Sequence, residues 1–491
     1  MNFLYNTSEI PHYEINEFRN KIINTVSSGG RIAAYFGVPS HQESVKLFVV
    51  FSYDNTGKIF IISSSVTKEY LSLTPECTQA HLFEREIFEQ CKIHPQTHPW
   101  LKPLRFHQDY NQQPLNSEIN VSKSDFYKIH GEEVHEVAVG PVHAGIIEPG
   151  HFRFQCRGEN VLHLEISLGY QYRAIEKNLV GGPHKKTLYQ METIAGDTSI
   201  GHTSAYCENL ESLAETVIPE RAAYLRAITL EIERIANHIG DLGALAGDIG
   251  FLPVYAYCGR IRGDFLNHTA FLCGNRFGRN MLLPGGVNFD IDSSDIPEFL
   301  SCIKKSYLDA KGAINLLFET PSVLSRFENT GQLSTKDAID LGLVGPAARA
   351  CSVKNDVRYN FQNLNKIYTG LPIAIGETGD VYARAMVRWL EIQNSIEFIE
   401  DKINKLPSGN IYTELKKLKK DSISISLIEG WRGEICHVAI TDKTGKLLTY
   451  KIVDPSFHNW AGLSMSMRNQ QISDFPLCNK SFNLSYCGHD L

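Results

Sequence analysis

The chain has 491 residues, more than one compact domain usually holds, so we expect at least two domains. Hydrophobic residues make up 43% of the composition and charged residues 21%, which excludes a disordered or low-complexity protein. The net charge of −7 provides no basic field for a phosphate backbone, so nucleic acid is not expected as a partner. No run approaches the roughly 20 apolar residues that span a bilayer, and the first residues do not form a signal peptide, so we expect a cytoplasmic protein.

The 11 cysteines contain no Cys-x-x-Cys pair. Their spacing excludes the common zinc and iron–sulfur motifs, and a disulfide framework is not expected in a reducing cytoplasm. The usual single-chain catalytic motifs are also absent from the sequence, including the Walker loop, Gly-x-Gly-x-x-Gly after a strand, the Gly-x-Ser-x-Gly elbow and His-Glu-x-x-His. Composition and common motifs therefore leave the function open.

The first 125 residues are expected to form a small α/β domain. Apolar periodicity predicts helices, and β-branched and aromatic runs predict strands. The expected elements are a helix over 12–27, strands over 31–38, 46–53 and 58–66, and a helix over 81–91. Asp54 to Gly57 has the composition of a hairpin turn. A segment rich in proline and polar residues over 94–125 then predicts a domain boundary, with the second domain over 126–491.

The second domain is expected to combine strands with long helices. The alternating residues Leu162, Leu164, Ile166 and Leu168 predict a strand with one buried face. Between 219 and 250, apolar residues recur at spacings of three and four, which is typical of a bundle helix. A helix over 380–404 repeats this pattern, and two strands over 434–442 and 446–453 follow it.

A second stripe on the 219–250 helix consists of ionisable residues. These are Glu231, Arg234, His238 and Asp241. Such a stripe is either a flank in contact with solvent or a charged seam against a neighbouring element. Composition alone favours the solvated flank, because charge runs usually face water.

Several clusters rich in Gly, Pro, Arg and His carry a family resemblance. They are GPVHAGIIEPGHFRFQ (140–155), LGYQYRAIEK (168–177), GHTSAYCENLE (201–211), EIERIANHIGDLGALAGDIGF (231–251), NRFGRNMLLPGGV (275–287), GDVYARAMVRWLE (379–391) and NLSYCGHDL (483–491). In this order they resemble the large subunit of group 4 energy-converting nickel–iron hydrogenases of the formate hydrogenlyase type. That protein is homologous to the quinone-site, D-type subunit of complex I, the NADH-quinone oxidoreductase, and residues 1–125 resemble the C-type subunit of the same complex. The resemblance implies a C-like domain followed by a hydrogenase-like domain with an antiparallel sheet and a long-helix bundle.

The nickel ligands of the family do not match this sequence. Active relatives hold nickel with four cysteine thiolates, and the resemblance places the four positions at Ala195, Thr198, Ser456 and Asn459. All four thiolates are therefore absent, and we expect neither nickel nor any other cofactor on this chain. The C-terminal tail resembles that of members that are not cleaved after metal insertion.

The quinone contacts of complex I are not retained either. In its D-type subunit a second His follows the first by four residues, whereas Ile147 follows His143 here. The quinone-site Tyr falls at Gly196. Both differences argue against ordinary quinone reduction, with His143 left as the remaining candidate of that loop.

Glu148 matches the glutamate that hydrogenase relatives use for proton transfer. A carboxylate in a partly apolar cavity holds its proton more tightly and exchanges it near neutral pH. The alternative is a structural Glu that pairs with Arg153 or Arg173, and the sequence favours neither role over the other.

Three polar residues near the vacated metal positions are a further candidate set. His202, His458 and Asp454 could bind another divalent ion, but isolated polar residues of this kind are more often satisfied by hydrogen bonds. In complex I, the helix with the ERIANHIGDLG-like motif faces the small subunit that carries the terminal 4Fe–4S cluster. The resemblance therefore makes Arg234 and His238 candidates for tuning that cluster, and it reverses the preference for a solvated flank.

The sequence as a whole predicts a non-nickel large subunit of a membrane-associated complex related to hydrogenases and complex I. It would form a scaffold for the iron–sulfur small subunit, handle protons and lie on the cytoplasmic face of the inner membrane. The expected partners are a small subunit similar to the B-type subunit of complex I, a ferredoxin-like subunit and antiporter-like membrane subunits, in an assembly of the kind that binds NAD and quinone and translocates protons. The alternative is a catalytic subunit that reduces quinone or another acceptor.

Overall fold

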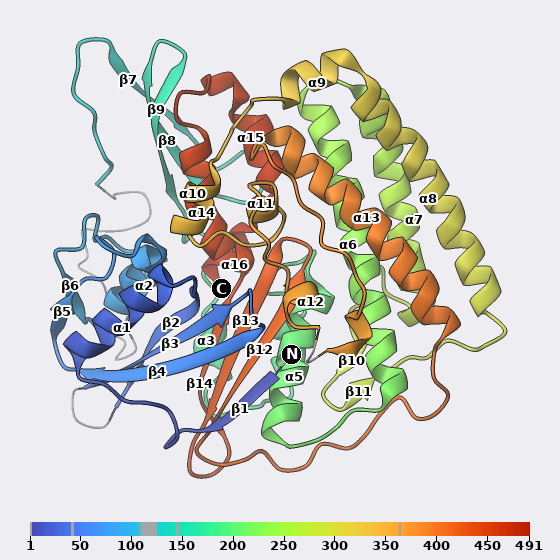
Figure 1. Cartoon of the computed structure of the whole chain (residues 1–491), viewed down its shortest axis with the longest axis horizontal. Coiled ribbons are helices and arrows are strands. Elements are labelled where there is room, and N and C mark those ends of the chain that lie inside the picture. Colours follow the sequence, from blue (N-terminus) through green and yellow to red (C-terminus); the bar gives the residue numbers. More distant parts are fainter. Residues whose placement is uncertain (1, 41–43, 108, 110–124, 144–146, 363–364) are drawn as a thin grey trace.

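The computed structural model describes residues 2–40, 44–107, 109, 125–143, 147–362 and 365–491. Helices and mostly antiparallel sheets are both abundant, which confirms the predicted α+β class. An N-terminal unit lies on one side of a central sheet, and a bundle of long helices lies on the other (Figure 1). The predicted domain boundary follows directly on residues 110–124, which lie outside the described residues, so the boundary stays a prediction.

The N-terminal unit matches the predicted elements closely. Its elements are α1 (Ile15–Ser27), β2 (Arg31–Pro39), β3 (Val45–Tyr53), β4 (Lys58–Val66), β5 (Glu69–Leu71), α2 (His81–Cys91) and β6 (His94–Gln96). β2, β3 and β4 pair antiparallel in that order, and the predicted turn joins Tyr53 to its partner Lys58. α1 packs on β4 and α2 packs on β2.

The central sheet joins distant parts of the chain. Its strands are β1 (Asn2–Asn6), β12 (Ser422–Gly430), β13 (Gly433–Thr441) and β14 (Leu447–Val453), paired antiparallel in that order. The predicted strand pair at the end of the chain is confirmed as β13 and β14, whereas β1 and β12 were not predicted. β1 pairs with β12, so the first residues contribute to this sheet rather than to the N-terminal one.

The two faces of the central sheet have different neighbours. Ile423, Ile425 and Leu427 of β12 share a hydrophobic core with the N-terminal unit. Ser424 and Ser426 alternate with them and donate hydrogen bonds to side chains of α5 (Ser199–Leu213) on the other face. This alternation places α5 and the N-terminal unit on opposite sides of the sheet.

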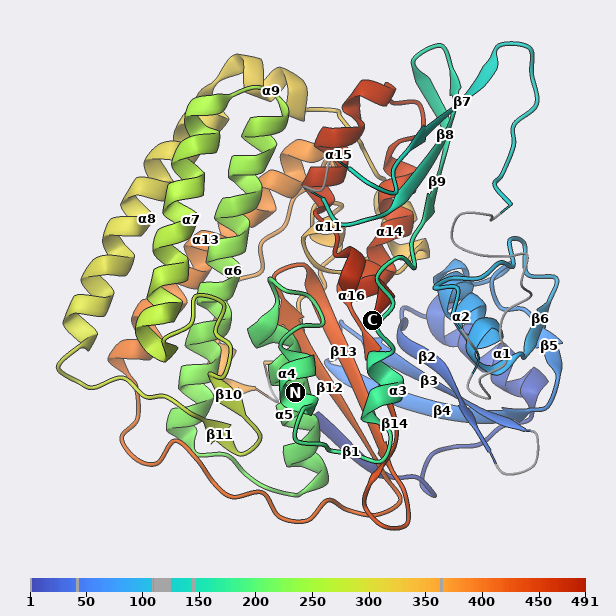
Figure 2. The same ribbon diagram turned by 180° about the vertical axis from the view of Figure 1, so that it is seen from behind.

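Four long helices form the predicted bundle. They are α6 (Glu220–Asp248), α7 (Leu252–Cys273), α8 (Ile296–Glu319) and α13 (Val381–Asn404), which lie side by side (Figure 2). The predicted apolar stripe of α6, from Leu225 to Leu242, is fully buried, which confirms the periodicity. α13 begins at Asp380, whose side chain accepts a hydrogen bond from the backbone N–H of Ala383.

A third sheet extends beside the central one. β7 (Val134–Val139), β8 (His151–Arg157) and β9 (Asn160–Ser167) pair antiparallel in that order. The predicted alternation in β9 is only partly right, since Leu164 and Leu168 are buried but Leu162 and Ile166 are half-buried. The register shifts at Gln155, which moves the buried face at the start of β9 from Leu162 to Val161.

The remaining elements connect the layers. They are α3 (Ile175–Leu179), α4 (Thr187–Met191), β10 (Leu282–Leu283), β11 (Gly286–Val287), α9 (Pro321–Phe327), α10 (Thr335–Asp340), α11 (Gly345–Arg349), α12 (Val357–Asn360), α14 (Pro455–Ser466), α15 (Phe475–Phe482) and α16 (Tyr486–Asp490). Across the described ranges, none of the helices combines the length and the apolar character that crossing a bilayer requires.

Candidate functional site

The four positions that the sequence aligned with nickel ligands lie in the core, near the starts of α5 and α14. Ala195 and Thr198 precede α5, and Ser456 and Asn459 lie in the first turns of α14. Each is no more than 1% exposed. The two helix starts are joined by a hydrogen bond of 3.0 Å between His202 and Asp454.

The polar side chains at these positions are used for hydrogen bonds within the protein. The amide of Asn459 accepts from the Val344 N–H and donates to the Val344 carbonyl, both at 3.0 Å. The hydroxyl of Ser456 accepts from the Ser485 N–H at 2.8 Å. The hydroxyl of Thr198 accepts from the indole N–H of Trp431 at 3.1 Å.

This donor set does not fit nickel. A nickel–iron site requires soft thiolate ligands, whereas Thr198, Ser456 and Asn459 present hard oxygen and amide groups and Ala195 presents no donor. Moving the three polar side chains toward a metal would also leave the buried backbone groups of Val344 and Ser485 without partners.

The turn between β12 and β13 anchors the start of α5. Arg432 in this turn binds both carboxylate oxygens of Asp197, at 2.6 and 2.7 Å. Its guanidinium lies 3.9 Å from the centre of the Trp431 ring. Gly345 (φ +68°) packs so closely on the turn that an added Cβ would lie 2.1 Å from the Arg432 carbonyl oxygen. The turn is therefore held on both sides.

A chain of buried hydrogen bonds runs from Asp454 into the central sheet. His202 Nε2 lies 3.0 Å from Asp454, His202 Nδ1 lies 3.1 Å from His437 Nε2, and His437 Nδ1 lies 3.0 Å from the Tyr450 hydroxyl. Asn209 donates to the Tyr450 hydroxyl at 3.4 Å. All partners are satisfied when each group donates toward Asp454, which assigns neutral Nε2–H tautomers to both histidines.

The electrostatics of this chain agree with that assignment. Burial and the neighbouring His202 hold the pKa of His437 well below its ordinary value. Burial raises the pKa of Tyr450 well above its ordinary value. Burial also acts to raise the pKa of Asp454, but the hydrogen bond from His202 and the charge of Arg432 outweigh it, so this pKa is lowered. Asp454 is therefore an ionised hydrogen-bond acceptor.

Glu233 of α6 completes the start of α5. Its carboxyl oxygens accept hydrogen bonds from the N–H groups of Ile200 and Gly201, at 2.7 and 3.1 Å. Burial raises the pKa of Glu233 to about 8. Neither Glu233 nor His437 nor Arg432 was predicted. A polar His within the apolar strand EICHVAI (434–440) is the one signal that pointed to such a partnership.

The predicted proton-transfer residue Glu148 is half-buried beside the C-terminal tail. It accepts a hydrogen bond from the Tyr486 N–H at 3.3 Å. Burial and the neighbouring Glu148 raise the pKa of the Cys487 thiol to about 12. The alternative ion pair is wrong, because Arg153 binds Glu136 at 2.8 Å and Arg173 donates to backbone carbonyls.

The loop that carries His143 is only partly described. His143 Nε2 lies 2.9 Å from the Gly150 carbonyl oxygen, so this nitrogen carries the proton. Residues 144–146 lie outside the described residues, and whether this loop and the Gly201–His202 segment enclose a cavity stays open. Of the bulky residues expected to fill such a cavity, Phe457 packs instead on Phe83 of the N-terminal unit.

The predicted divalent-ion site does not form. His202 binds Asp454, but His458 lies against the Phe83 ring, 5.7 Å between ring centres. Burial lowers the pKa of His458 to about 3. In the described part of the chain, no three His, Cys, Asp or Glu side chains are arranged to hold a metal ion.

Arg234 and His238 are buried within the chain rather than on a solvated flank. Both are 0% exposed, so the composition-based preference was wrong. Arg234 binds Glu231 and the Glu429 and Gly430 carbonyls, and His238 Nε2 lies 2.8 Å from Glu391 on α13. α13 supplies the partner that composition could not reveal.

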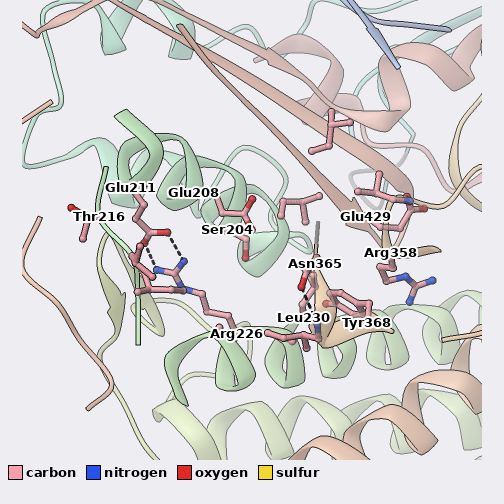
Figure 3. A pocket seen from close by; sticks show the side chains of 18 residues that line it. Ser204, Glu208, Glu211, Thr216, Arg226, Leu230, Arg358, Asn365, Tyr368 and Glu429 are labelled. Carbon is pink, nitrogen blue, oxygen red and sulfur yellow. Dashed lines mark hydrogen bonds and ion pairs between the residues drawn. The ribbon is translucent and has the colours of Figure 1, made fainter. Parts of the chain in front are cut away.

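A pocket of about 430 Å³ lies between α5, α6, residues 365–368 and β12. Glu211 and Arg226 form an ion pair at one end, and Glu429 and Arg358 lie at the other (Figure 3). Glu429 therefore contacts both the pocket and the buried charges around Arg234.

Comparisons with known families agree with the two-part architecture. Residues 30–125 match the family described as respiratory-chain NADH dehydrogenase, 30 Kd subunit. Residues 248–425 match the family described as respiratory-chain NADH dehydrogenase, 49 Kd subunit.

Individual relatives are hydrogenase and complex I subunits. The carbon monoxide-induced hydrogenase of Rhodospirillum rubrum is 32% identical over 71% of this chain and 96% of its own length. Formate hydrogenlyase subunit 5 of Escherichia coli is 27% identical over 93% of this chain and 84% of its own length. The D 1 subunit of the NADH-quinone oxidoreductase of Chloroherpeton thalassium is 29% identical over 70% and 84%. The chain thus belongs to the family that unites the large subunits of group 4 hydrogenases with the D-type subunit of complex I, fused here to a 30 kDa-type domain.

Proposed function

We propose that this chain is the non-nickel large subunit of a membrane-associated oxidoreductase complex related to hydrogenases and complex I. It acts as a scaffold for an iron–sulfur small subunit that resembles the B-type subunit of complex I and carries a 4Fe–4S cluster. A ferredoxin-like subunit and antiporter-like membrane subunits complete the complex, on the cytoplasmic face of the inner membrane. The chain itself carries no metal and takes part in proton movement.

One observation carries the non-nickel role. The side chains at three of the four ligand positions are each committed to a buried hydrogen bond with another part of the chain. Asn459 binds the segment before α11, and Thr198 binds the turn after β12. The positions that hold metal in active relatives therefore join four segments of this chain, which suits a scaffold.

The proton-handling role rests on Glu148 and on the buried charges of α6. Glu148 lies beside the Cys487 thiol at the tail, where a carboxyl group can exchange a proton. Arg234 and His238 are fully buried, so their effect on a partner's cluster would act through electrostatics rather than direct contact. We expect His238→Ala to shift the cluster potential and to weaken its pH dependence.

The experiment is purification of the tagged chain from membranes of its native host. We expect a small subunit with a 4Fe–4S cluster and membrane subunits to copurify in fixed proportion. Redox titration of that preparation then compares wild type with His238→Ala. Recovery of the chain as a free monomer from native membranes and cytosol would refute the scaffold role, and an unchanged potential would refute the tuning role.

The second candidate is a catalytic subunit that reduces quinone or another acceptor. It is supported by Gly196, which is exposed and has no neighbouring atom within 4 Å of an added Cβ. Space for a head group therefore exists where the quinone-site Tyr of complex I falls. Photolabelling of the complex with an azido-quinone separates the two candidates: labelling of residues 140–150 or 195–202 supports acceptor reduction, and its absence supports the scaffold.

A further inference from the structure

A cluster of charged side chains is enclosed between α6, α11, the start of α12, α13 and β12. Its members are Glu231, Arg234, His238, Arg349, Asp356, Arg358, Glu391 and Glu429. None of them is more than 4% exposed. Such a group must be close to electrical neutrality, because an unbalanced buried charge costs several kcal/mol.

The charges of this cluster do not balance without an added proton. Three guanidinium groups, of Arg234, Arg349 and Arg358, face four carboxyl groups. Arginine stays protonated in proteins, so it cannot correct the difference. The adjacent Asp241 and Arg388 neutralise each other in a pair of 2.9 Å. One carboxyl group or His238 must therefore hold a proton.

The contacts favour Glu429 as the holder of this proton. Glu391 contacts Arg234, Arg349, Arg358 and His238 within 4 Å, so it is stabilised as a carboxylate. Glu429 has a single guanidinium partner, Arg349 at 2.8 Å, and a backbone donor, the Val357 N–H at 3.0 Å.

The other groups around Glu429 and His238 act in the same direction. Burial and the charge of Asp356 raise the pKa of Glu429 to about 7, against the opposing charges of Arg349, Arg358 and Arg234. Burial lowers the pKa of His238, and the charges of Arg388 and Arg234 oppose the stabilising effect of Glu391. Near neutral pH the proton therefore belongs on Glu429.

Two further features connect the cluster with water. Glu429 and Arg358 line one end of the pocket in Figure 3, whose rim includes Val217, 87% exposed. Deeper inside, His238 Nδ1, Glu231 Oε1 and Arg349 Nε have no hydrogen-bond partner among the described residues. Buried polar atoms of this kind usually bind ordered water.

We propose that this cluster is a proton-binding site that holds one exchangeable proton on Glu429 and exchanges it with solvent through the pocket between α5 and α6. In the step itself, hydronium transfers a proton to the Glu429 carboxylate and leaves as water, with no change of oxidation state. Arg349 and Glu391 link the charge of Glu429 to His238. The site lies wholly on this chain and does not depend on the partners or the activity proposed above.

Difference infrared spectroscopy of the purified full chain during pH titration tests this proposal. We expect a carboxylic acid C=O band that disappears as pH rises through the neutral range. Glu429→Gln should remove the band, whereas Glu397→Gln, on an exposed position of α13, should leave it unchanged. A band that persists in Glu429→Gln, or no titrating band in wild type, would overturn the proposal.

Asp356→Asn provides a second test in a chain that keeps Glu429. The substitution retains the side-chain oxygen that accepts the Arg358 N–H, but it removes one negative charge and balances the cluster. We expect the band to be absent at neutral pH and to appear only in more acidic solution. A band at the wild-type midpoint would refute the charge-balance argument.

The route through the pocket is tested separately by hydrogen–deuterium exchange of the same band. Val217→Trp adds bulk at the exposed rim and should slow the exchange several-fold without moving the pH midpoint. Leu308→Trp, on an exposed position of α8 far from the pocket lining, is the control. Equal exchange rates in both variants would refute entry through this pocket.

Discussion

His202 donates a buried hydrogen bond of 3.0 Å to Asp454 and thereby ties the first turn of α5 to the start of α14. Asp454 also accepts from the Ser456 N–H, at 2.7 Å, and so caps α14. One carboxylate thus holds together the two segments that carry the vacated ligand positions.

This pair should show strong energetic coupling. In a double-mutant cycle with His202→Ala and Asp454→Ala, we expect a coupling free energy of about 1.5–3 kcal/mol, typical of a buried hydrogen bond to a charged group. The exposed ion pair of Arg157 and Glu133 is the control and should couple weakly. Denaturant unfolding measures both cycles, and equal values would contradict a structural role for the buried pair.

Asn459→Ala should destabilise the chain by about 2–4 kcal/mol, because it leaves a buried N–H and a buried C=O of Val344 without partners. Asn459→Cys, which restores one ancestral ligand type, should lose the same two hydrogen bonds. Asn404→Ala at the exposed end of α13 should change the unfolding free energy by no more than about 0.5 kcal/mol. An Asn459→Ala protein as stable as Asn404→Ala would show that the Val344 contact is dispensable.

Glu233 should make stability depend on pH. Its folded pKa of about 8 lies above its ordinary value of 4.5, so the folded state binds a proton that the unfolded state has released between these values. This contribution is fully present below the ordinary value and is lost as pH rises through the folded pKa, by up to about 1.4 kcal/mol per pH unit. Glu233→Gln should abolish this slope in urea unfolding, and Glu397→Gln should retain it. A slope that survives in Glu233→Gln belongs to another group.

Glu148→Gln should abolish proton-linked activity in inverted membrane vesicles without preventing assembly, because it keeps the shape of the side chain and removes the titrating group. Glu136→Gln, on the exposed strand β7, is the matched control. Normal vesicle activity in Glu148→Gln would remove this residue from proton handling and leave the scaffold role intact.

The sequence predicted the elements whose pattern is local. The strands of the N-terminal unit, the stripe of α6 and the final strand pair follow from periodicity and turn residues. β12 was missed although SISIS alternates, because four of its nine residues are serine or glycine. β1 was missed because its partner lies more than 400 residues away.

The site was predicted less completely, because its side chains depend on contacts between distant segments. The resemblance identified His202, Asp454 and the vacated ligand positions, but periodicity could not show that Arg432 binds Asp197 or that His437 faces His202. The stripe with Arg234 was first assigned to solvent because only the packing of α13 on α6 shows that it is enclosed.

The most direct test of the non-nickel role is elemental analysis of the native complex purified through a tag on this chain. With Ala195, Thr198, Ser456 and Asn459 in place of thiolates, we predict iron from the partner subunits, no stoichiometric nickel and no hydrogen evolution. One nickel per chain in the active complex would contradict the role proposed here.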